Sequence, residues 1–329
     1  MQLVIDTFGT SVHRKQNAFE IVNKEGKKRV SPQKIRTIVL NCAAKISSDA
    51  VILAVENEID ILFVDKSGKP QARVWSHKFG PLTTIRKNQL KFAESQEGLA
   101  WAGQRVWKKM QQQAAFLYQL RYSFSVLSPE KIDACIKTIE AVALQLQELL
   151  RSAKGRDKGL AASCRGWEGT ASRHYFQGLA WALPPGYHFA GRTKRPAKDP
   201  FNCVLNYLYG MLYSFVEVEL LKAGIDPHIG VLHADQYKRP VFVYDFIESY
   251  RIWADTVAFR LFQRYALNER DFEPCEGGLW LAGSGKREVI PAFHQYLYEP
   301  YSLKKKQKTR MQHLSVECRQ LAKSLLQRE

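Results

Sequence analysis

Short apolar runs separated by turn-forming residues occupy the first 75 positions of the chain. Runs of this length that are rich in Val, Ile and Phe are typical of β-strands, and Lys-containing segments with Gly, at 24–27 and 66–69, are typical of tight turns. The pattern predicts seven or eight strands in a small β domain, in runs that include residues 3–6, 18–23, 37–41, 50–55 and 59–65.

The spacing of apolar residues changes after residue 85. Leu99, Val106 and Met110 are seven and four residues apart, in phase with the three- and four-residue steps of an amphipathic helix, and this pattern continues to Leu120. Further helices are predicted at about 129–150, 160–182, 201–223, 240–266, 288–300 and 308–327. The sequence therefore predicts an α+β protein, with an N-terminal β-sheet domain at 1–75, a Gly-Pro-containing linker at 76–85 and a larger all-α catalytic domain at 86–329.

Several classes of protein conflict with the composition. The chain has no stretch of about 18 apolar residues that could cross a membrane, and its N-terminus does not have the pattern of a signal peptide. We therefore expect a cytoplasmic protein without a membrane partner. The six cysteines form no C-x-x-C pair, which argues against a zinc ribbon and favours free thiols.

The charge of the chain points to a polyanionic partner. Lys and Arg number 49 against 32 Asp and Glu, a formal net charge of +17. Nearly half of this excess lies in residues 151–198, which carry ten basic and two acidic side chains, a net of +8. Such a concentration favours nucleic acid as the partner. One of the two acids is Glu168, whose isolation among basic residues marks it as a candidate functional group.

A proline-rich basic loop follows this region. Residues 184–200 contain four prolines, two glycines and the fixed charges of Arg192, Lys194, Arg195 and Lys198. Loops of this length within a helical domain are usually functional or disordered. Contacts with DNA phosphates and simple exposure to solvent both agree with this composition. A second basic run, 304–310, has the same two interpretations.

Polar residues on otherwise apolar segments supply candidate chemistry. Glu168 lies among small residues, with Gly169 directly after it. His233 ends an apolar run, and Asp245 and Glu248 are three residues apart on one predicted helix, with Asp255 seven residues further on. Carboxylates with one imidazole suit Mg²⁺ or Mn²⁺, and a basic groove around them would suit phosphodiester chemistry. Taken singly, each residue could equally be structural: a core histidine, or an acidic pair on a solvated face.

Together, the segments resemble a known family in their order along the chain. Residues 168–176 read E-G-x-A-x-R-x-Y-F, residues 192–202 read R-x-x-R-P-x-x-D-P-x-N, residues 224–233 read G-I-D-P-x-I-G-x-L-H, and residues 245–251 read D-F-x-E-x-Y-R. This combination resembles the CRISPR-associated integrase and endonuclease of the Cas-one family. Glu248 and Tyr250 depart from it, since Asp and Phe are common there, and residues 241–244 are bulkier than expected.

The resemblance implies spacer acquisition in CRISPR adaptation. It assigns catalysis to Glu168, His233, Asp245 and Glu248, with Glu168, His233 and Glu248 as ligands of Mg²⁺ or Mn²⁺. The implied reaction inserts prespacer DNA into the repeat array by attack of a 3′-hydroxyl on a phosphodiester, with nuclease activity when water attacks instead. Phosphates would be bound by five arginines, Arg173, Arg192, Arg195, Arg239 and Arg251.

The resemblance also implies partners. They are double-stranded DNA (the prespacer and the repeat array), a second copy of the chain that meets the first through the β domain, and a small ferredoxin-like second adaptation protein that completes a hetero-hexamer. Two alternatives agree with the same residues: a metallonuclease that repairs branched DNA, and a DNA-binding scaffold without catalytic activity.

Overall fold

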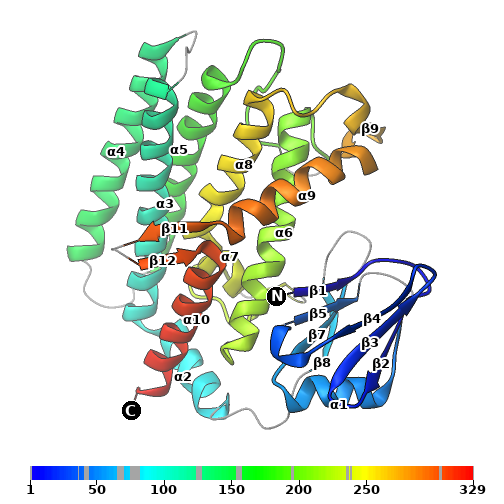
Figure 1. Ribbon diagram of the computed structural model, residues 1–329. Helices are drawn as coiled ribbons and strands as arrows, with labels where there is room; N and C mark the ends of the chain where they lie inside the picture. Colours follow the sequence, from blue (N-terminus) through cyan, green and yellow to red (C-terminus); the bar gives the residue numbers. More distant parts are fainter. Residues whose placement is uncertain are drawn as a thin grey trace. The chain divides into compact units, whose positions relative to one another are not determined.

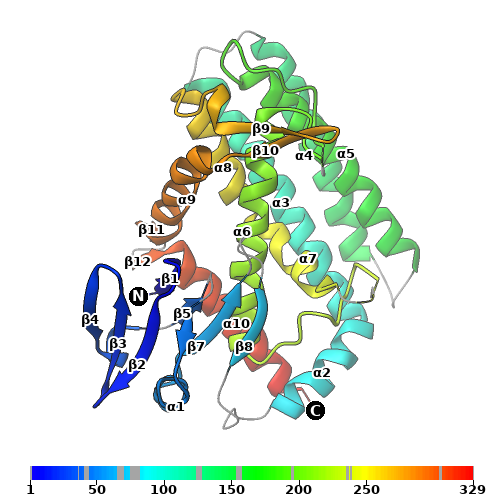
Figure 2. The same ribbon diagram turned by 90° about the vertical axis from the view of Figure 1, so that its right-hand side faces the viewer.

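The computed structural model describes two compact units, each with a hydrophobic core of its own (Figures 1 and 2). The first unit comprises Met1–Gly80 and the second Pro81–Glu329. The residues that the structure describes are 2–35, 37–40, 44–64, 70–74, 82–123, 128–152, 158–193, 196–234, 237, 239–303 and 306–328. The predicted linker 76–85 is therefore described only from residue 82, where a helix begins.

The first unit contains two four-stranded sheets. One is formed by β1 (Gln2–Ile5), β5 (Thr37–Leu40), β7 (Asp60–Val64) and β8 (Pro70–Val74), in the order β1-β5-β7-β8. In this sheet β1, β5 and β7 are parallel, and β8 is antiparallel to β7. The other has the order β4-β3-β2-β6, with strands β2 (Ser11–Lys15), β3 (Ala18–Asn23), β4 (Gly26–Val30) and β6 (Lys45–Ile46). The predicted mixture of N-terminal strands and a helical remainder is confirmed.

One predicted strand of this unit is a helix. The run at 50–55 lies in α1 (Ser48–Glu56), which buries Ala50, Leu53 and Ala54 on one face and packs against β2 and β7. Because β5 and β7 are parallel, the chain must cross over between them, and a helix is the usual crossover. The topology of the sheet therefore decides the conformation of an apolar run whose composition also suits a strand.

Three long helices pack side by side in the second unit, as both views show (Figures 1 and 2). They are α3 (Gln96–Ser123), α4 (Pro129–Ser152) and α5 (Lys158–Ala182). The helical pattern predicted from residue 85 to 120 is interrupted once. α2 (Leu82–Glu94) ends before Ser95, whose hydroxyl donates to the Phe92 carbonyl at 2.8 Å and accepts the Gly98 amide at 3.0 Å. This local capping is invisible in the apolar spacing.

The segment predicted as one helix at 240–266 has three parts. These are α7 (Val241–Ile247), a 3₁₀ turn η2 (Glu248–Tyr250) and α8 (Arg251–Gln263). α7 and α8 both pack against α6 (Pro200–Lys222), and η2 packs against α3. The bulky residues at its start fit this packing, since Phe242 is buried and stacks on Trp101 of α3.

The C-terminal part adds two hairpins that the sequence pattern did not predict. The hairpin of β9 (Phe272–Cys275) and β10 (Gly278–Leu281) follows a 3₁₀ turn, η3 (Glu269–Asp271), and precedes α9 (Gly283–Tyr298). The hairpin of β11 (Pro300–Leu303) and β12 (Lys306–Thr309) leads into α10 (Arg310–Leu326). Of the basic run at 304–310, residues 306–309 form β12, and residues 304–305 lie outside the described ranges. Five cysteines are free, and Cys42 lies outside the described residues. None of the described helices is long and apolar enough to cross a membrane.

A buried carboxyl group ties α8 to its neighbours. Asp255 is 1% exposed and accepts hydrogen bonds from the hydroxyls of Tyr175 on α5, at 3.0 Å, and Tyr209 on α6. Burial raises the pKa of the Asp255 carboxyl to about 6, although the two hydroxyl donors and nearby guanidinium groups oppose the shift. The folded protein therefore takes up a proton at this position more readily than the unfolded chain does.

We expect Asp255→Asn to remove part of the pH dependence of folding. Because the pKa of Asp255 is raised in the folded state, the free energy of unfolding falls as pH rises from about 4 to about 6, by up to about 3 kcal/mol. Asparagine carries no charge and can keep hydrogen bonds to both tyrosines. Urea unfolding from pH 4 to 7 should show a flatter profile for the variant, and parallel profiles would contradict this role of Asp255.

Candidate active site

Glu168 lies on α5 with open space around it. A Cβ atom added at the neighbouring Gly166 or Gly169 would meet nothing within 4 Å, and the Glu168 side chain is 32% exposed. Its Oε1 accepts a hydrogen bond from Ser172, one helical turn further on, at 3.1 Å. This geometry leaves room for a reactant to approach the Glu168 carboxylate closely.

Glu248 is the buried counterpart of Glu168. It begins the 3₁₀ turn η2, is 5% exposed, and its Oε1 lies 2.8 Å from Nε of Arg251. Burial alone would raise the pKa of this carboxyl, but the positive charges of Arg251 and Lys109 outweigh burial and lower it to about 2. Glu248 is therefore ionised at neutral pH.

Lys109 joins the two carboxylates, and none of the sequence motifs contains it. Its Nζ contacts Oε1 of Glu168 and lies 2.7 Å from Oε2 of Glu248, while the residue is 6% exposed. Burial alone would lower the pKa of the ammonium, but the charges of Glu248 and Glu168 raise it. One signal could have revealed it: position 109 falls on the buried face of α3, between Val106 and Met110, where a lysine requires an acidic partner.

Asp245 holds the backbone that precedes the candidate histidine. Its carboxylate is fully buried on α7 and accepts hydrogen bonds from three consecutive amides, those of Val231 at 2.6 Å, Leu232 at 3.1 Å and His233 at 3.1 Å. A second anchor comes from α5, where a guanidinium nitrogen of Arg165 donates to the Leu232 carbonyl at 3.0 Å. The loop is thereby fixed to two helices.

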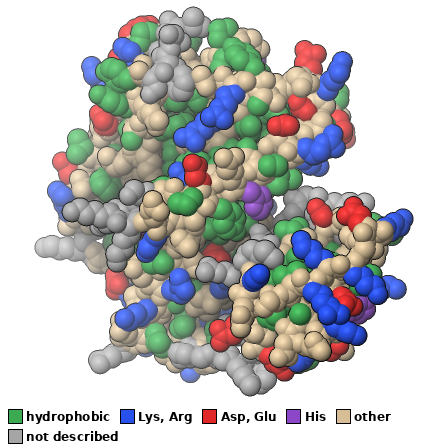
Figure 3. Space-filling view, in the orientation of Figure 1, with side chains coloured by type: hydrophobic (Ala, Val, Ile, Leu, Met, Phe, Trp, Pro, Cys, Tyr) green, Lys and Arg blue, Asp and Glu red, His purple; other side chains and the backbone are tan. Residues whose placement is uncertain are grey.

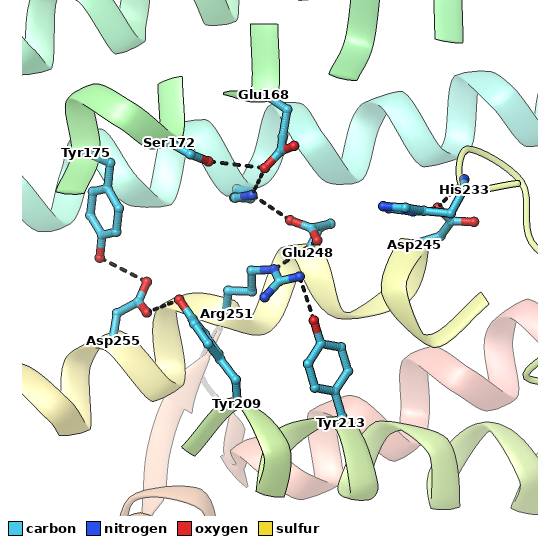
Figure 4. Close-up of polar contacts among 11 residues, drawn as sticks. Glu168, Ser172, Tyr175, Tyr209, Tyr213, His233, Asp245, Glu248, Arg251 and Asp255 are labelled. Atoms are coloured by element: carbon cyan, nitrogen blue, oxygen red, sulfur yellow. Dashed lines mark hydrogen bonds and ion pairs between the residues drawn. The ribbon is translucent and has the colours of Figure 1, made fainter. Parts of the chain in front are cut away.

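The same carboxylate orients the His233 ring. Nδ1 of His233 lies 2.6 Å from Oδ1 of Asp245, and Figure 4 shows the ring directed toward Glu248. This hydrogen bond raises the pKa of His233 above its usual value, against the opposing effect of burial. It also favours the tautomer with the proton on Nδ1, which leaves Nε2 as a free electron-pair donor.

The predicted phosphate-binding arginines fall into two groups. Arg173 and Arg239 are exposed and can reach a ligand in solvent. Arg192 and Arg251 are partly buried and bonded within the protein: Arg192 donates to Asn202 at 3.0 Å and to Asn206 at 2.7 Å, and Arg251 binds Glu248 and the Tyr213 hydroxyl. Arg195 lies outside the described residues.

The described part of the proline-rich loop packs on the protein. Asp199 caps α6 by accepting the Asn202 amide at 2.7 Å, and the Ala197 carbonyl accepts the amide of Leu279 in β10 at 2.9 Å. On the face drawn in Figure 3, the described Lys and Arg side chains lie in small groups with Asp and Glu among them. Of the basic residues in 151–198, Arg165 and Arg192 donate hydrogen bonds to groups within the protein, so part of the positive charge of this segment has internal partners.

The donors at this site fit a divalent cation. Within the described ranges, no three His, Cys, Asp or Glu side chains converge closely enough to hold an ion as they stand. However, the carboxylates of Glu168 and Glu248 already share one cation, the Lys109 ammonium, and an oriented imidazole faces them. Two carboxylates and one nitrogen are donors that Mg²⁺ and Mn²⁺ accept, and an Asp–His pair is a usual support for such a ligand. The ion remains a prediction.

Comparison with known sequences identifies relatives along nearly the whole chain. The family model described as CRISPR associated protein Cas1 matches residues 3–295. A CRISPR-associated endonuclease Cas1 of Archaeoglobus fulgidus is 30% identical, with 90% of this chain and 88% of the relative covered. A second, from Thermodesulfovibrio yellowstonii, is 28% identical, with 84% of each covered.

Solved structures share the fold at lower sequence identity. A Cas1 protein from Thermotoga maritima has a TM-score of 0.75 at 18% identity, with 100% of this chain and 98% of that chain covered. A casposase bound to its integration product has a TM-score of 0.73 at 21% identity, with 100% and 91% covered. These identities establish similarity of fold alone.

The Asp245–His233 pair yields a prediction that needs no activity assay. We expect the His233 ring to titrate above pH 6.5 in the wild-type protein, because protonation strengthens its hydrogen bond to Asp245, and Asp245→Asn should lower this pKa. NMR titration of the histidine ring resonances in both proteins would measure the two values. A His233 pKa that is the same in both proteins would contradict the proposed contact.

Proposed function

Because this chain belongs to the Cas1 family of CRISPR-associated proteins, we propose that it is a metal-dependent DNA endonuclease and integrase of CRISPR adaptation. The observation that carries the proposal is the pair of carboxylates, Glu168 and Glu248, that share one cation beside the oriented ring of His233. The similar fold of a casposase bound to an integration product supports integration as the reaction.

Glu168, Glu248 and Nε2 of His233 would hold Mg²⁺ or Mn²⁺. Such an ion polarises a phosphodiester and increases the acidity of a hydroxyl that attacks it. In integration, the 3′-hydroxyl oxygen of the incoming DNA forms a bond to a phosphorus atom of the repeat, the 3′-oxygen of the cut strand leaves, and the proton passes to solvent. Water in place of the hydroxyl gives hydrolysis.

The remaining site residues prepare this chemistry. Asp245 fixes the tautomer and direction of His233, Arg251 keeps Glu248 ionised, and Ser172 restrains Glu168. The exposed Arg173 and Arg239 are the proposed phosphate-binding side chains among the described arginines. Arg192, which uses its donors within the protein, is proposed instead to hold the loop at 191–193 against α6.

We propose a homodimer formed through the first unit, together with a small second adaptation protein. Two solved structures of similar fold are a Cas6-RT-Cas1–Cas2 complex, of whose matching chain this chain covers 35%, and a partial form of that complex, which supports a partner of that kind. Of the edge strands, β4 carries exposed Lys27, Lys28 and Arg29, a charge pattern that discourages pairing between copies, whereas β1 exposes Val4 at 46%. The β1 edge is therefore the proposed contact between copies.

The central test is Glu168→Ala in an integration assay. We expect joining of a labelled prespacer to a repeat-bearing plasmid to fall at least about 100-fold, because charge stabilisation by a metal ion contributes several kcal/mol and each ~1.4 kcal/mol is a factor of ten. Glu140→Ala, at an exposed position on α4, is the matched control and should retain activity. Full Mn²⁺-dependent activity of Glu168→Ala on branched or half-integrated DNA would overturn the assignment.

Binding of DNA should depend steeply on salt. If phosphates bind Arg173 and Arg239, then Arg173→Gln and Arg239→Gln should each reduce the slope of log affinity against log salt concentration by about 1. Arg264→Gln, at the exposed C-terminal end of α8 and about 20 Å along the helix from Arg251, should leave the slope unchanged. Fluorescence anisotropy with a labelled duplex measures each slope. An affinity that stays constant from low to physiological salt would contradict phosphate binding.

A further inference from the structure

The Lys109 ammonium occupies the space between the two proposed metal-binding carboxylates. Its Nζ contacts Oε1 of Glu168 and Oε2 of Glu248, and its side chain is 7% exposed. The other oxygen of Glu248, Oε1, lies 2.8 Å from Arg251. Both oxygens of Glu248 therefore already have a cationic partner, and an ion that binds Glu248 competes with one of them.

Arg251 is held too firmly to be the partner that leaves. Its second guanidinium contact is the Tyr213 hydroxyl at 2.8 Å, and the guanidinium carbon lies 5.1 Å from the Tyr209 ring centre and 5.5 Å from that of Tyr213. A planar guanidinium fixed by a hydroxyl and two aromatic rings has little freedom to withdraw.

Lys109 has the freedom that Arg251 lacks. An ammonium on a flexible four-carbon stem can rotate away from its partners without disturbing the helix that carries it. The solvent side is open at Glu168, whose side chain is 32% exposed next to the empty space at Gly166 and Gly169. A cation can therefore enter from that side while the lysine withdraws.

We propose that Lys109 is a tethered cation that occupies the divalent-ion position in the metal-free protein and is displaced when the ion binds. The inference rests on the proposed metal site. In the metal-free state the ammonium relieves the repulsion between Glu168 and Glu248, and in the metal-bound state its charge opposes the ion. Lys109 is a positioning residue, and metal binding becomes an exchange of one cation for another.

Removal of the ammonium should therefore strengthen metal binding. In Lys109→Met, we expect the dissociation constant for Mn²⁺ to fall roughly ten- to a hundredfold, because a like charge leaves the immediate surroundings of the ion. Equilibrium titration of the full chain with Mn²⁺, with free ion measured by electron paramagnetic resonance, gives the constant without DNA or catalysis. Lys109→Arg, which keeps the charge, should not bind more tightly than wild type.

Lys108→Met is the matched control. It removes the same charge from the neighbouring position of α3, but the Lys108 ammonium lies over the Tyr250 ring, at 5.9 Å, and not between the carboxylates. Its Mn²⁺ affinity should remain within about threefold of wild type, because charges beyond the immediate surroundings of a site are screened by salt. Thermal unfolding gives a second readout for Lys109→Met. In EDTA this variant should melt at a lower temperature than wild type, and saturating Mn²⁺ should raise its melting temperature by more than it raises that of wild type.

Two results would overturn the inference in distinguishable ways. The first is that wild type binds Mn²⁺, Glu168→Ala abolishes this binding, and Lys109→Met binds Mn²⁺ no more tightly than wild type does. This result refutes the exchange and leaves the metal site standing. Absence of Mn²⁺ binding in every variant, including wild type, refutes the metal site and the exchange with it. If Lys109→Met does not fold, Lys109→Gln carries the same expectation with a polar side chain in place of the ammonium.

Discussion

Compensation of buried negative charge is the constraint on which the candidate site depends. A carboxylate as buried as Glu248 is destabilising unless cations and hydrogen-bond donors replace its lost water. Glu248 is paired with Lys109 of α3 and with Arg251 of α8. The Lys109 ammonium also pairs with Glu168 on α5. Three segments that lie far apart in the sequence are therefore held together by one group of alternating charges.

A second buried carboxylate builds the neighbouring part of the site by the same logic. Asp245 satisfies its charge with three backbone amides and the imidazole of His233, so the loop that carries the histidine cannot move without exposing an unpaired charge. Arg105 of α3 holds α7, the helix that carries Asp245. Its guanidinium stacks on the Phe246 ring, donates to the Phe246 carbonyl and pairs with Glu317 of α10 at 2.9 Å. The C-terminal helix thus supports a site to which it contributes no catalytic group.

The sequence predicts the helical elements of this protein better than its electrostatics. Amphipathic spacing locates the long helices because burial of one face determines both pattern and conformation. It misplaces α1, since an apolar run of six residues suits either a strand or a crossover helix, and the parallel pairing that decides between them is a contact between distant residues. Motif resemblance points to Glu168, His233 and Glu248. Lys109 belongs to none of these motifs, and its role depends on the two carboxylates that the fold places next to it.

The same distinction changes the meaning of the net charge of +17. Counted along the chain, every arginine and lysine adds to attraction for a polyanion. In the folded protein, however, several of these side chains face inward and donate hydrogen bonds to carboxylates, carbonyls and amides. They are Lys109, Arg105, Arg192 and Arg251. Such groups contribute to the long-range field but release no counterion when DNA binds, because no phosphate replaces their existing partners. Within residues 151–198, Arg192 therefore adds to the net charge without adding to the number of phosphates that the protein can hold.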